Sequence, residues 1–327
     1  MPRSMDGKRQ AADTNAALVS SDINVKTAWL YYVEGLTQEQ IAEKLNVSRV
    51  KIMRTLAACT AEGVVITTIN AQSTKQVAAE RALEKRYGLD SAVVVPTPEA
   101  AEHLEKSIGH AVALYLGNHM KDNMTLAIGG GATLHASLAY LGRRQLKNAS
   151  VIGLVGALPH SQWINPSIVA AKVADLFGID SYQITAPVML HDPVLRDLLW
   201  AQPELMDVKT RAANADIALL TVGEISPEAT IFRHGLVLPS LIPSLRAKGA
   251  QANVLSYFID AQGKLVDHEV NDRVMAIGLD VVSAIPNVVL AAGGLHKLAA
   301  IRAALNAFAT NVLITDSQTA QALIAAE

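Results

Sequence analysis

The sequence of 327 residues lacks several features that would place it in a familiar class. Its single cysteine, Cys59, excludes an internal disulfide and a cluster of thiolate metal ligands, and it fits a reducing cytoplasm. No uninterrupted apolar run reaches the roughly 18 to 20 residues that a membrane span requires. The formal net charge is only −2, so a chain-wide basic surface that would bind any nucleic acid is missing. We therefore expect a cytoplasmic protein without a membrane span, and any DNA contact must be local.

Motifs for metals, cofactors and hydrolysis are missing as well. The nine histidines show no metal-type spacing, and no Gly-x-Ser-x-Gly elbow is present. The sequence has two glycine-rich segments, at residues 129–131 and 293–294, and neither has the form of a Walker loop or of a dinucleotide fingerprint. We therefore expect no metal site, no cofactor and no catalytic residue. Residues 1–21 contain charged and small polar side chains but no apolar stretch, so they are predicted to form a flexible arm and not a secretory signal.

Residues 22–70 have the pattern of a helix-turn-helix. Apolar side chains at helical spacing predict a first helix over residues 25–33. A short second helix follows Thr37, because Gln40 stands three residues later in the capping-box position. Asn46 then supplies a residue that tolerates the left-handed backbone of a tight turn between helices.

The third helix of this segment is the candidate for DNA recognition. It is expected from about Arg49 to Ala61, with Ser48 as its N-cap, and small Ala42 allows the second helix to cross it closely. The residues predicted to face DNA are Gln38, Ser48, Arg49, Val50, Lys51, Met53 and Arg54. Arginine in a major groove can bind guanine or phosphate, and lysine can bind phosphate. The partner would be double-stranded operator DNA.

Two features around this helix leave its role open. An extended, β-rich run over residues 62–69 is consistent with the strand of a wing. Five basic residues between residues 21 and 70 are balanced by five acidic ones, so an ordinary three-helix accessory bundle remains an alternative. The basic residues nevertheless concentrate on the third helix, and this placement favours DNA binding.

The remaining chain alternates between strand and helix patterns. A connecting helix is expected in residues 71–87, and an effector domain in residues 88–327. Apolar strands are predicted at 91–95, 124–128, 151–155, 182–185, 217–222, 254–259, 288–292 and 312–315. This alternation indicates an α/β fold with a mainly parallel, doubly wound sheet, in which ligands bind beyond the carboxyl ends of the strands.

Two of these strand ends carry the candidate ligand residues. The strand at residues 124–128 enters the glycine turn Gly129, Gly130 and Gly131, and the following helix begins with Ala132 and Thr133. Backbone N–H groups would therefore face a phosphate or hydroxyl there. A plain tight turn is the alternative.

The second strand end has the turn Gly293–Gly294, followed by Lys297 at the start of a helix. Because a cation at a helix N-terminus is disfavoured by the helix dipole, Lys297 gains most if an anionic ligand binds beside it. A solvated surface lysine is the alternative. An enzyme would need a base beside the ligand, and no carboxylate or histidine is placed convincingly at either glycine turn in the sequence.

The order of these motifs resembles that of the SorC-type regulators, a family of sugar-sensing bacterial repressors and activators. The similar stretches are residues 29–32, 35–42, 126–133, 215–218, 248–250, 257–260 with Gly263, 292–297, and 313–316 with Thr319 and Ala320. The resemblance implies an effector domain like that of phosphosugar isomerases. It also implies that the turn from Gly129 to Thr133 cradles one end of a phosphorylated sugar or related compound, and that Lys297 meets its charge.

The chain departs from the family's pattern at two positions. Family members often have Gly-Asp where this chain has Ala252-Asn253, and Asn253 can bind a hydroxyl but cannot act as a charged acceptor. Asn46 stands where the turn between helices commonly has glycine, and asparagine can adopt the same backbone shape.

The sequence therefore predicts a transcriptional regulator, not an enzyme, that a small sugar, polyol or sugar phosphate controls. It would govern a carbohydrate catabolic operon and bind a palindromic operator as a homodimer or homotetramer. A phosphosugar isomerase or deaminase with an added helical domain is the alternative, and an adaptor without DNA affinity is a third reading.

Overall fold

The structure is a computed structural model that describes residues 23–66, 74–158 and 165–326. The chain divides into two compact units, Met1–Asn70 and Ala71–Glu327. The expected arm at residues 1–21 and the end of the expected wing, residues 67–69, lie outside the described residues. No helix in the described part is both long enough and apolar enough to cross a membrane.

The smaller unit contains the three expected helices. Residues 23–32 are helical, and they are followed by α2 (Gln38–Leu45) and α3 (Arg49–Ala61). The helices enclose a small apolar core of Leu30, Ile41, Ala42, Ile52 and Leu56. Ala42 is only 8% exposed, as expected for the small residue at the crossing of α2 and α3.

The caps of α2 and α3 have the geometry that the sequence predicts. Thr37 and Gln40 form a reciprocal capping box, with the Gln40 N–H donating to Thr37 Oγ1 at 3.2 Å and the Thr37 N–H donating to Gln40 Oε1 at 2.9 Å. Asn46 is left-handed, with φ 54° and ψ 48°. Ser48 Oγ accepts the N–H of Lys51 and begins α3. The predicted wing strand is wrong for residues 62–66, which form a turn and a bend that returns Val65 N–H to the carbonyl of Cys59 at 3.0 Å.

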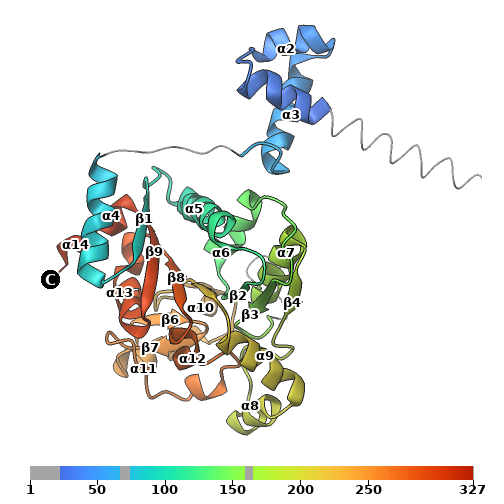
Figure 1. Cartoon of the computed structure of the whole chain (residues 1–327). Coiled ribbons are helices and arrows are strands. Elements are labelled where there is room, and N and C mark those ends of the chain that lie inside the picture. The colour runs from blue at the N-terminus through green and yellow to red at the C-terminus, as the bar shows by residue number, and fades with distance from the viewer. Residues whose placement is uncertain (1–22, 67–73, 159–164, 327) are drawn as a thin grey trace, which may run out of the picture. The chain divides into compact units, whose positions relative to one another are not determined.

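The larger unit is built on a sheet of seven strands in the order β1-β9-β8-β5-β2-β3-β4, and every neighbouring pair is parallel (Figure 1). The strands are β1 (Ser91–Val95), β2 (Thr125–Ile128), β3 (Ser150–Gly153), β4 (Asp180–Tyr182), β5 (Ile217–Leu220), β8 (Asn287–Ala291) and β9 (Thr310–Asp316). The predicted parallel, doubly wound class is confirmed.

Helices cover both faces of this sheet (Figure 1). The helices are α4 (Thr74–Tyr87), α5 (Leu104–His119), α6 (Ala132–Ser137), α7 (Pro166–Phe177), α8 (Pro193–Trp200), α9 (Pro203–Ala213), α10 (Thr230–Arg233), α11 (Ile242–Ala247), α12 (Leu279–Ser283), α13 (Leu298–Ala307) and α14 (Ser317–Ala325). Alternate side chains of β2 separate the two layers. Leu126 and Ile128 pack in the core with α5, α6 and α7, while Ala127 packs in the core with α4, α9, α13 and α14.

The order of the strands creates a switch point between β2 and β5. From β2 the chain continues to β3 and β4 on one side, and later strands β5, β8 and β9 build the sheet on the other side. The crossovers that leave β2 and β5 therefore run in opposite directions. In an open parallel sheet this leaves a crevice beyond the carboxyl ends of the two strands, where ligands bind.

One predicted strand is two strands in the structure. The run 254–259 is divided between β6 (Ala252–Val254) and β7 (Tyr257–Ile259), which pair as an antiparallel hairpin. Leu255 and Ser256 form the two-residue turn, with φ values of 50° and 70°. Neither residue type favours this backbone, so the turn could not be predicted from the residue types.

Candidate functional site

The outward face of α3 in the smaller unit is exposed and cationic. Arg49, Lys51 and Arg54 are exposed, and none of them forms an ion pair within the part of the chain that the structure describes. Val50 and Met53 are 53% and 51% exposed on the same helix. Exposed apolar side chains between unpaired cations suit a groove that offers thymine methyl groups beside phosphates and base edges.

Gln38 lies next to this face. It is half-buried at the start of α2, and together with Thr37 and Arg49 it lines a shallow hollow between α2 and α3. Ser48 is exposed, but its hydroxyl oxygen already accepts the Lys51 N–H as the helix cap. The fold therefore brings the seven predicted DNA residues to neighbouring positions at the starts of two helices.

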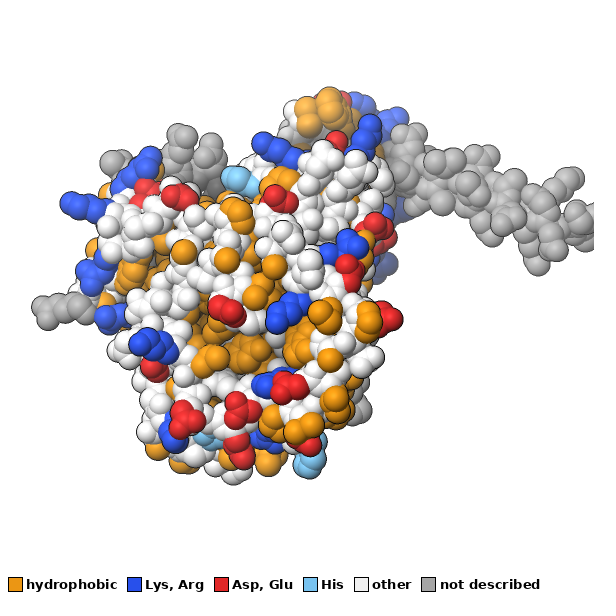
Figure 2. Space-filling view, turned by 60° about the horizontal axis from the view of Figure 1, so that its bottom comes forward, with side chains coloured by type: hydrophobic (Ala, Val, Ile, Leu, Met, Phe, Trp, Pro, Cys, Tyr) orange, Lys and Arg blue, Asp and Glu red, His pale blue; other side chains and the backbone are white. Residues whose placement is uncertain are grey.

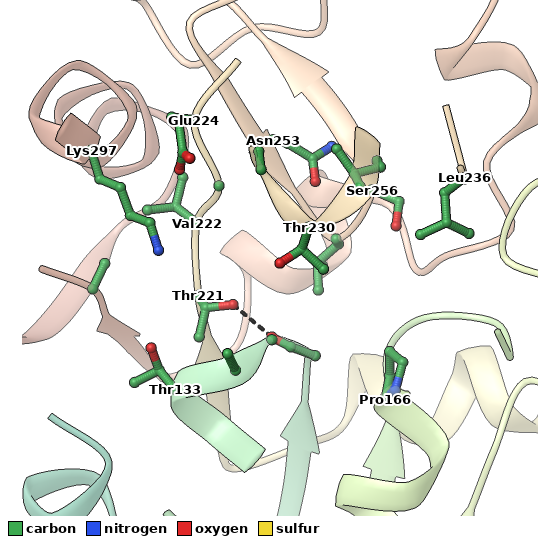
Figure 3. Close-up of a pocket in the computed structure, with 18 of the residues that line it drawn as sticks. Thr133, Pro166, Thr221, Val222, Glu224, Thr230, Leu236, Asn253, Ser256 and Lys297 are labelled. Atoms are coloured by element: carbon green, nitrogen blue, oxygen red, sulfur yellow. Dashed lines mark hydrogen bonds between the residues drawn. The ribbon is translucent and has the colours of Figure 1, made fainter. Parts of the chain in front are cut away.

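The larger unit has a cavity of about 330 Å³ beyond the carboxyl ends of β2, β5 and β8, at the switch point of the sheet (Figure 3). A volume of this size suits a small-molecule ligand. Figure 3 shows the side chains of Thr133, Thr230, Asn253, Ser256 and Lys297 converging on this space from different elements. Segments that are far apart in the sequence thus build one site.

Six of the nine predicted ligand residues line this cavity: Gly130, Gly131, Ala132, Thr133, Asn253 and Lys297. Gly129, Gly293 and Gly294 do not. The Gly129 N–H continues the sheet by donating to Leu219 O at 2.9 Å. The Gly294 N–H donates to Asp316 Oδ2 at 3.0 Å and to Thr319 Oγ1 at 2.8 Å, so it is not free for a ligand.

The turn after β2 requires glycine at two positions. Gly131 has φ 119°, and a Cβ there would lie 2.6 Å from Thr221 Oγ1. A Cβ at Gly130 would lie 2.6 Å from the ring of Pro166. The Thr221 hydroxyl donates to Gly130 O at 2.6 Å, which ties the ends of β2 and β5 together. The turn therefore brings its backbone to the cavity wall, because no side chain stands between them.

Acidic groups and a histidine also reach the cavity, which the sequence did not indicate. Glu105, Glu224, Glu228 and His296 line it. The expectation that no carboxylate or histidine lies beside the glycine turns is therefore wrong. Glu224 and Glu228 come from the loop between β5 and α10. Their position in the cavity wall could have been inferred from the rule that the loops after parallel strands build the ligand site.

Asn253 occupies a defined orientation on β6. Its Nδ2 donates to Tyr257 O at 3.1 Å, and Figure 3 shows its amide oxygen directed toward the cavity. Tyr257 in turn donates its hydroxyl to Ala276 O at 3.0 Å, and burial raises the pKa of Tyr257 to about 12. Asn253 therefore presents an acceptor, which suits a ligand hydroxyl group. Among the described residues, no group of three or more His, Cys, Asp or Glu side chains is placed to hold a metal ion.

Comparison with known proteins assigns this architecture to a family. Residues 71–325 match the family model described as "Putative sugar-binding domain". The transcriptional regulator LsrR of Klebsiella pneumoniae is 30% identical over 316 residues, which cover 94% of each chain. This chain belongs to the SorC/DeoR-type sugar-binding transcriptional regulators.

Two further proteins are similar to this chain over most of its length. The erythritol catabolism regulatory protein EryD of Brucella abortus is 28% identical over 302 residues, covering 92% of this chain and 95% of EryD. The full-length sorbitol operon regulator SorC from Klebsiella pneumoniae has the same fold, with a TM-score of 0.71, 22% identity, and coverage of 93% of this chain and 98% of SorC.

The cavity of this SorC/DeoR-type regulator contains a strained turn. Leu255 and Ser256 both line the cavity and both have positive φ, a region that costs an L-residue about 1 to 2 kcal/mol. Leu255 is 7% exposed, and its Cδ2 would lie 3.1 Å from a Cβ built on Gly129. Tertiary packing therefore holds the turn against its local preference.

A matched pair of variants separates the strain from the hydroxyl group of Ser256. Ser256→Gly and Ser256→Ala both remove the hydroxyl, but only glycine relieves the backbone. We expect the glycine variant to be more stable than the alanine variant by about 1 kcal/mol, as measured by urea denaturation. Equal stabilities would show that the positive φ of Ser256 carries no cost.

In this regulator a buried carboxylate holds the second glycine turn. Asp316 is 1% exposed and accepts hydrogen bonds from Thr97 Oγ1, Thr319 Oγ1 and Gly294 N–H. Burial acts to raise the pKa of Asp316, but these hydrogen bonds together lower the pKa by more than burial raises it. The net shift of the pKa is therefore downward. Lys297 follows this turn and stands at the N-cap of α13, so Asp316 positions the backbone from which Lys297 extends.

Replacing Asp316 with asparagine should alter the pH dependence of stability. Because the folded pKa is below the unfolded value of about 3.9, the carboxylate stabilises the fold above that pH and loses this contribution as the pH falls through the folded pKa. We expect the free energy of unfolding to fall more steeply with acid in the wild type than in Asp316→Asn between about pH 5 and pH 3. Parallel pH profiles from urea denaturation would contradict this account.

Proposed function

We propose that α3 binds operator DNA and that a small sugar, polyol or sugar phosphate in the cavity changes the affinity for that operator. The observation that carries the proposal is the presence, in one chain, of an exposed cationic helix after a left-handed turn and of a separate polar cavity at a sheet switch point. Such a protein would act in the cytoplasm, where the chromosome and the metabolite meet.

The DNA contact is local to α3. On the face of the larger unit that Figure 2 shows, acidic and basic side chains are mixed with hydrophobic patches, and neither sign of charge dominates. Arg49 and Arg54 would bind guanine or phosphate, and Lys51 phosphate. A homodimer or homotetramer would present paired α3 helices to a palindromic operator, with half-sites roughly 34 to 36 Å apart or at multiples of that spacing.

The names of the relatives support a carbohydrate or polyol as the effector. EryD is named for erythritol catabolism, and SorC for the sorbitol operon. By analogy this chain would control a catabolic operon for a sugar or polyol. The effector can shift the DNA-binding equilibrium only if it binds the two arrangements of the oligomer with unequal affinity.

An enzyme is the second candidate, because Glu224, Glu228 and His296 line the cavity and could act as acid or base. Relatives named as transcriptional regulators support the first candidate. Incubating the purified chain with sugar phosphates separates the two. Ligand binding without product formation supports a regulator, whereas turnover supports an isomerase or deaminase.

The proposal is tested by a gel-shift titration. An operator is first selected from random double-stranded DNA, and the affinity for it is then measured over a series of sugars, polyols and their phosphates. We expect at least one ligand that binds the chain to change operator affinity. If every ligand that binds leaves operator affinity unchanged, the switching role is refuted.

A further inference from the structure

Most of the enclosed polar side chains that line the cavity are uncharged. Thr133 is 7% exposed, and Thr221, Thr230, Asn253 and Ser256 are half-buried. Each can donate to a hydroxyl group, accept from one, or do both. The enclosed part of the cavity therefore has the chemistry of a binding site for several hydroxyl groups.

The charged groups of the cavity do not form a site for a strong anion. Among the described residues, its lining contains the three carboxylates Glu105, Glu224 and Glu228, but only two cationic side chains, Arg233 and Lys297. Of these five groups, only Glu224 and Lys297 are half-buried, and the other three are exposed. The half-buried pair has no net charge. A phosphate ester carries a charge of about −1.5 to −2 at neutral pH. If it were partly buried here, its negative charge would not be balanced by an excess of half-buried cationic side chains.

The cationic groups are also poorly suited to a phosphate ester. Arginine is the side chain that binds phosphate through two parallel hydrogen bonds, and Arg233, the single arginine among the described residues of the lining, is exposed. Lys297 has three donors that can be shared between neighbouring hydroxyl oxygens as well as given to a phosphate. Glu224 lines the same cavity and can accept hydrogen bonds from the same hydroxyl groups, which favours hydroxyl groups as the partners of Lys297.

We propose that the effector is an uncharged polyol or sugar and that its phosphate ester is discriminated against. Glu224 and the amide oxygen of Asn253 accept hydrogen bonds from ligand hydroxyl groups, while Lys297, Ser256 and the N–H groups of the first glycine turn donate to hydroxyl oxygens. This inference rests on the proposed function for the role of the ligand. Its test, however, measures ligand binding without DNA and so can fail independently.

The direct test compares matched ligands on the full chain by calorimetry. Erythritol, ribitol and sorbitol are each titrated beside their own monophosphate, at equal ionic strength. We expect at least one polyol to bind, and to bind at least about tenfold more tightly than its monophosphate. A monophosphate that binds as tightly as its polyol, or more tightly, overturns the proposal, and so does a failure of all three polyols to bind.

Variants of two carboxylates test the role of Glu224. Glu224→Gln keeps the shape of the side chain but removes its charge, so we expect polyol affinity to fall about tenfold and the preference over the monophosphate to narrow. Glu99→Gln removes the same charge from an exposed position that does not line the cavity, and it should change polyol affinity less than about threefold. Equal effects of the two substitutions on the preference would overturn the assignment to Glu224.

Inorganic phosphate provides a test that does not depend on the choice of polyol. We expect it to raise the melting temperature of the wild type no more than sulfate does at equal ionic strength. A rise specific to phosphate that is lost in Lys297→Gln would reveal a built phosphate site and overturn the proposal. If the proposed function alone fails, the polyol preference is still observed, but no bound ligand changes operator affinity.

Discussion

Replacing Arg49 and Arg54 together with alanine should lower operator affinity at least about 30-fold, because each arginine contact to a base or phosphate contributes about 1 to 3 kcal/mol. Both side chains are exposed on α3 and make no ion pair among the described residues. Their loss should therefore leave the fold intact. The measurement is fluorescence anisotropy with labelled operator, followed by calorimetry to show that effector binding is unchanged.

A charge-matched control makes this experiment specific. Lys121→Ala with Lys147→Ala removes the same charge from exposed positions of the larger unit and should change operator affinity less than about threefold. The salt dependence of operator binding should decrease in the α3 double variant but not in the control, because phosphate contacts release counterions. Retained operator affinity in the α3 variant would mean that another surface binds the DNA.

Replacing Lys297 with alanine should uncouple the regulator from its effector. Lys297 is half-buried in the cavity wall, and no hydrogen bond or ion pair within the described residues occupies its ammonium group. Because hydrogen bonds to a charged group contribute about 1.5 to 3 kcal/mol, effector affinity should fall roughly 10- to 100-fold. Operator affinity without effector should not change.

The control for this variant lies on the same turn. Leu295 is 55% exposed and does not line the cavity, so Leu295→Ala should bind the effector as the wild type does. Calorimetry with the effector measures both variants, and anisotropy measures operator binding. An unchanged effector affinity in Lys297→Ala would remove this lysine from the site.

The local chemistry of the chain made much of the smaller unit predictable. The capping box of Thr37 and Gln40, the left-handed Asn46 and the Ser48 cap depend on contacts within a few residues, and the sequence shows all of them. The parallel sheet was predictable for a similar reason, since buried strands such as β5 are apolar on both faces. The glycine turn after β2 could be found because its backbone requires glycine.

Other parts of the site depend on tertiary packing and could not be predicted. Nothing in Leu255-Ser256 indicates a two-residue turn, because neither residue favours positive φ, and the turn is held by the surroundings of Leu255. Gly293 and Gly294 looked like a second ligand turn, but Asp316, some twenty residues later, takes the Gly294 N–H. The sequence pattern alone could not show which acceptor an N–H group would meet.

The position of the cavity explains how a ligand could influence the rest of the chain. Its wall combines the ends of β2, β5 and β8 with the β6–β7 turn, so one small ligand can contact segments with separate connections to the core. A ligand that binds one arrangement of these segments more tightly shifts the equilibrium by its difference in affinity, and by no more. A tenfold change in operator affinity requires only about 1.4 kcal/mol of such coupling.

The most direct test of this account is the operator affinity of the wild type, measured by anisotropy with and without a saturating effector. We expect the effector to change the dissociation constant at least about tenfold, within the usual range of coupling between two binding sites. If a ligand shown by calorimetry to bind the cavity leaves the dissociation constant unchanged, the two sites are not coupled and the account is wrong.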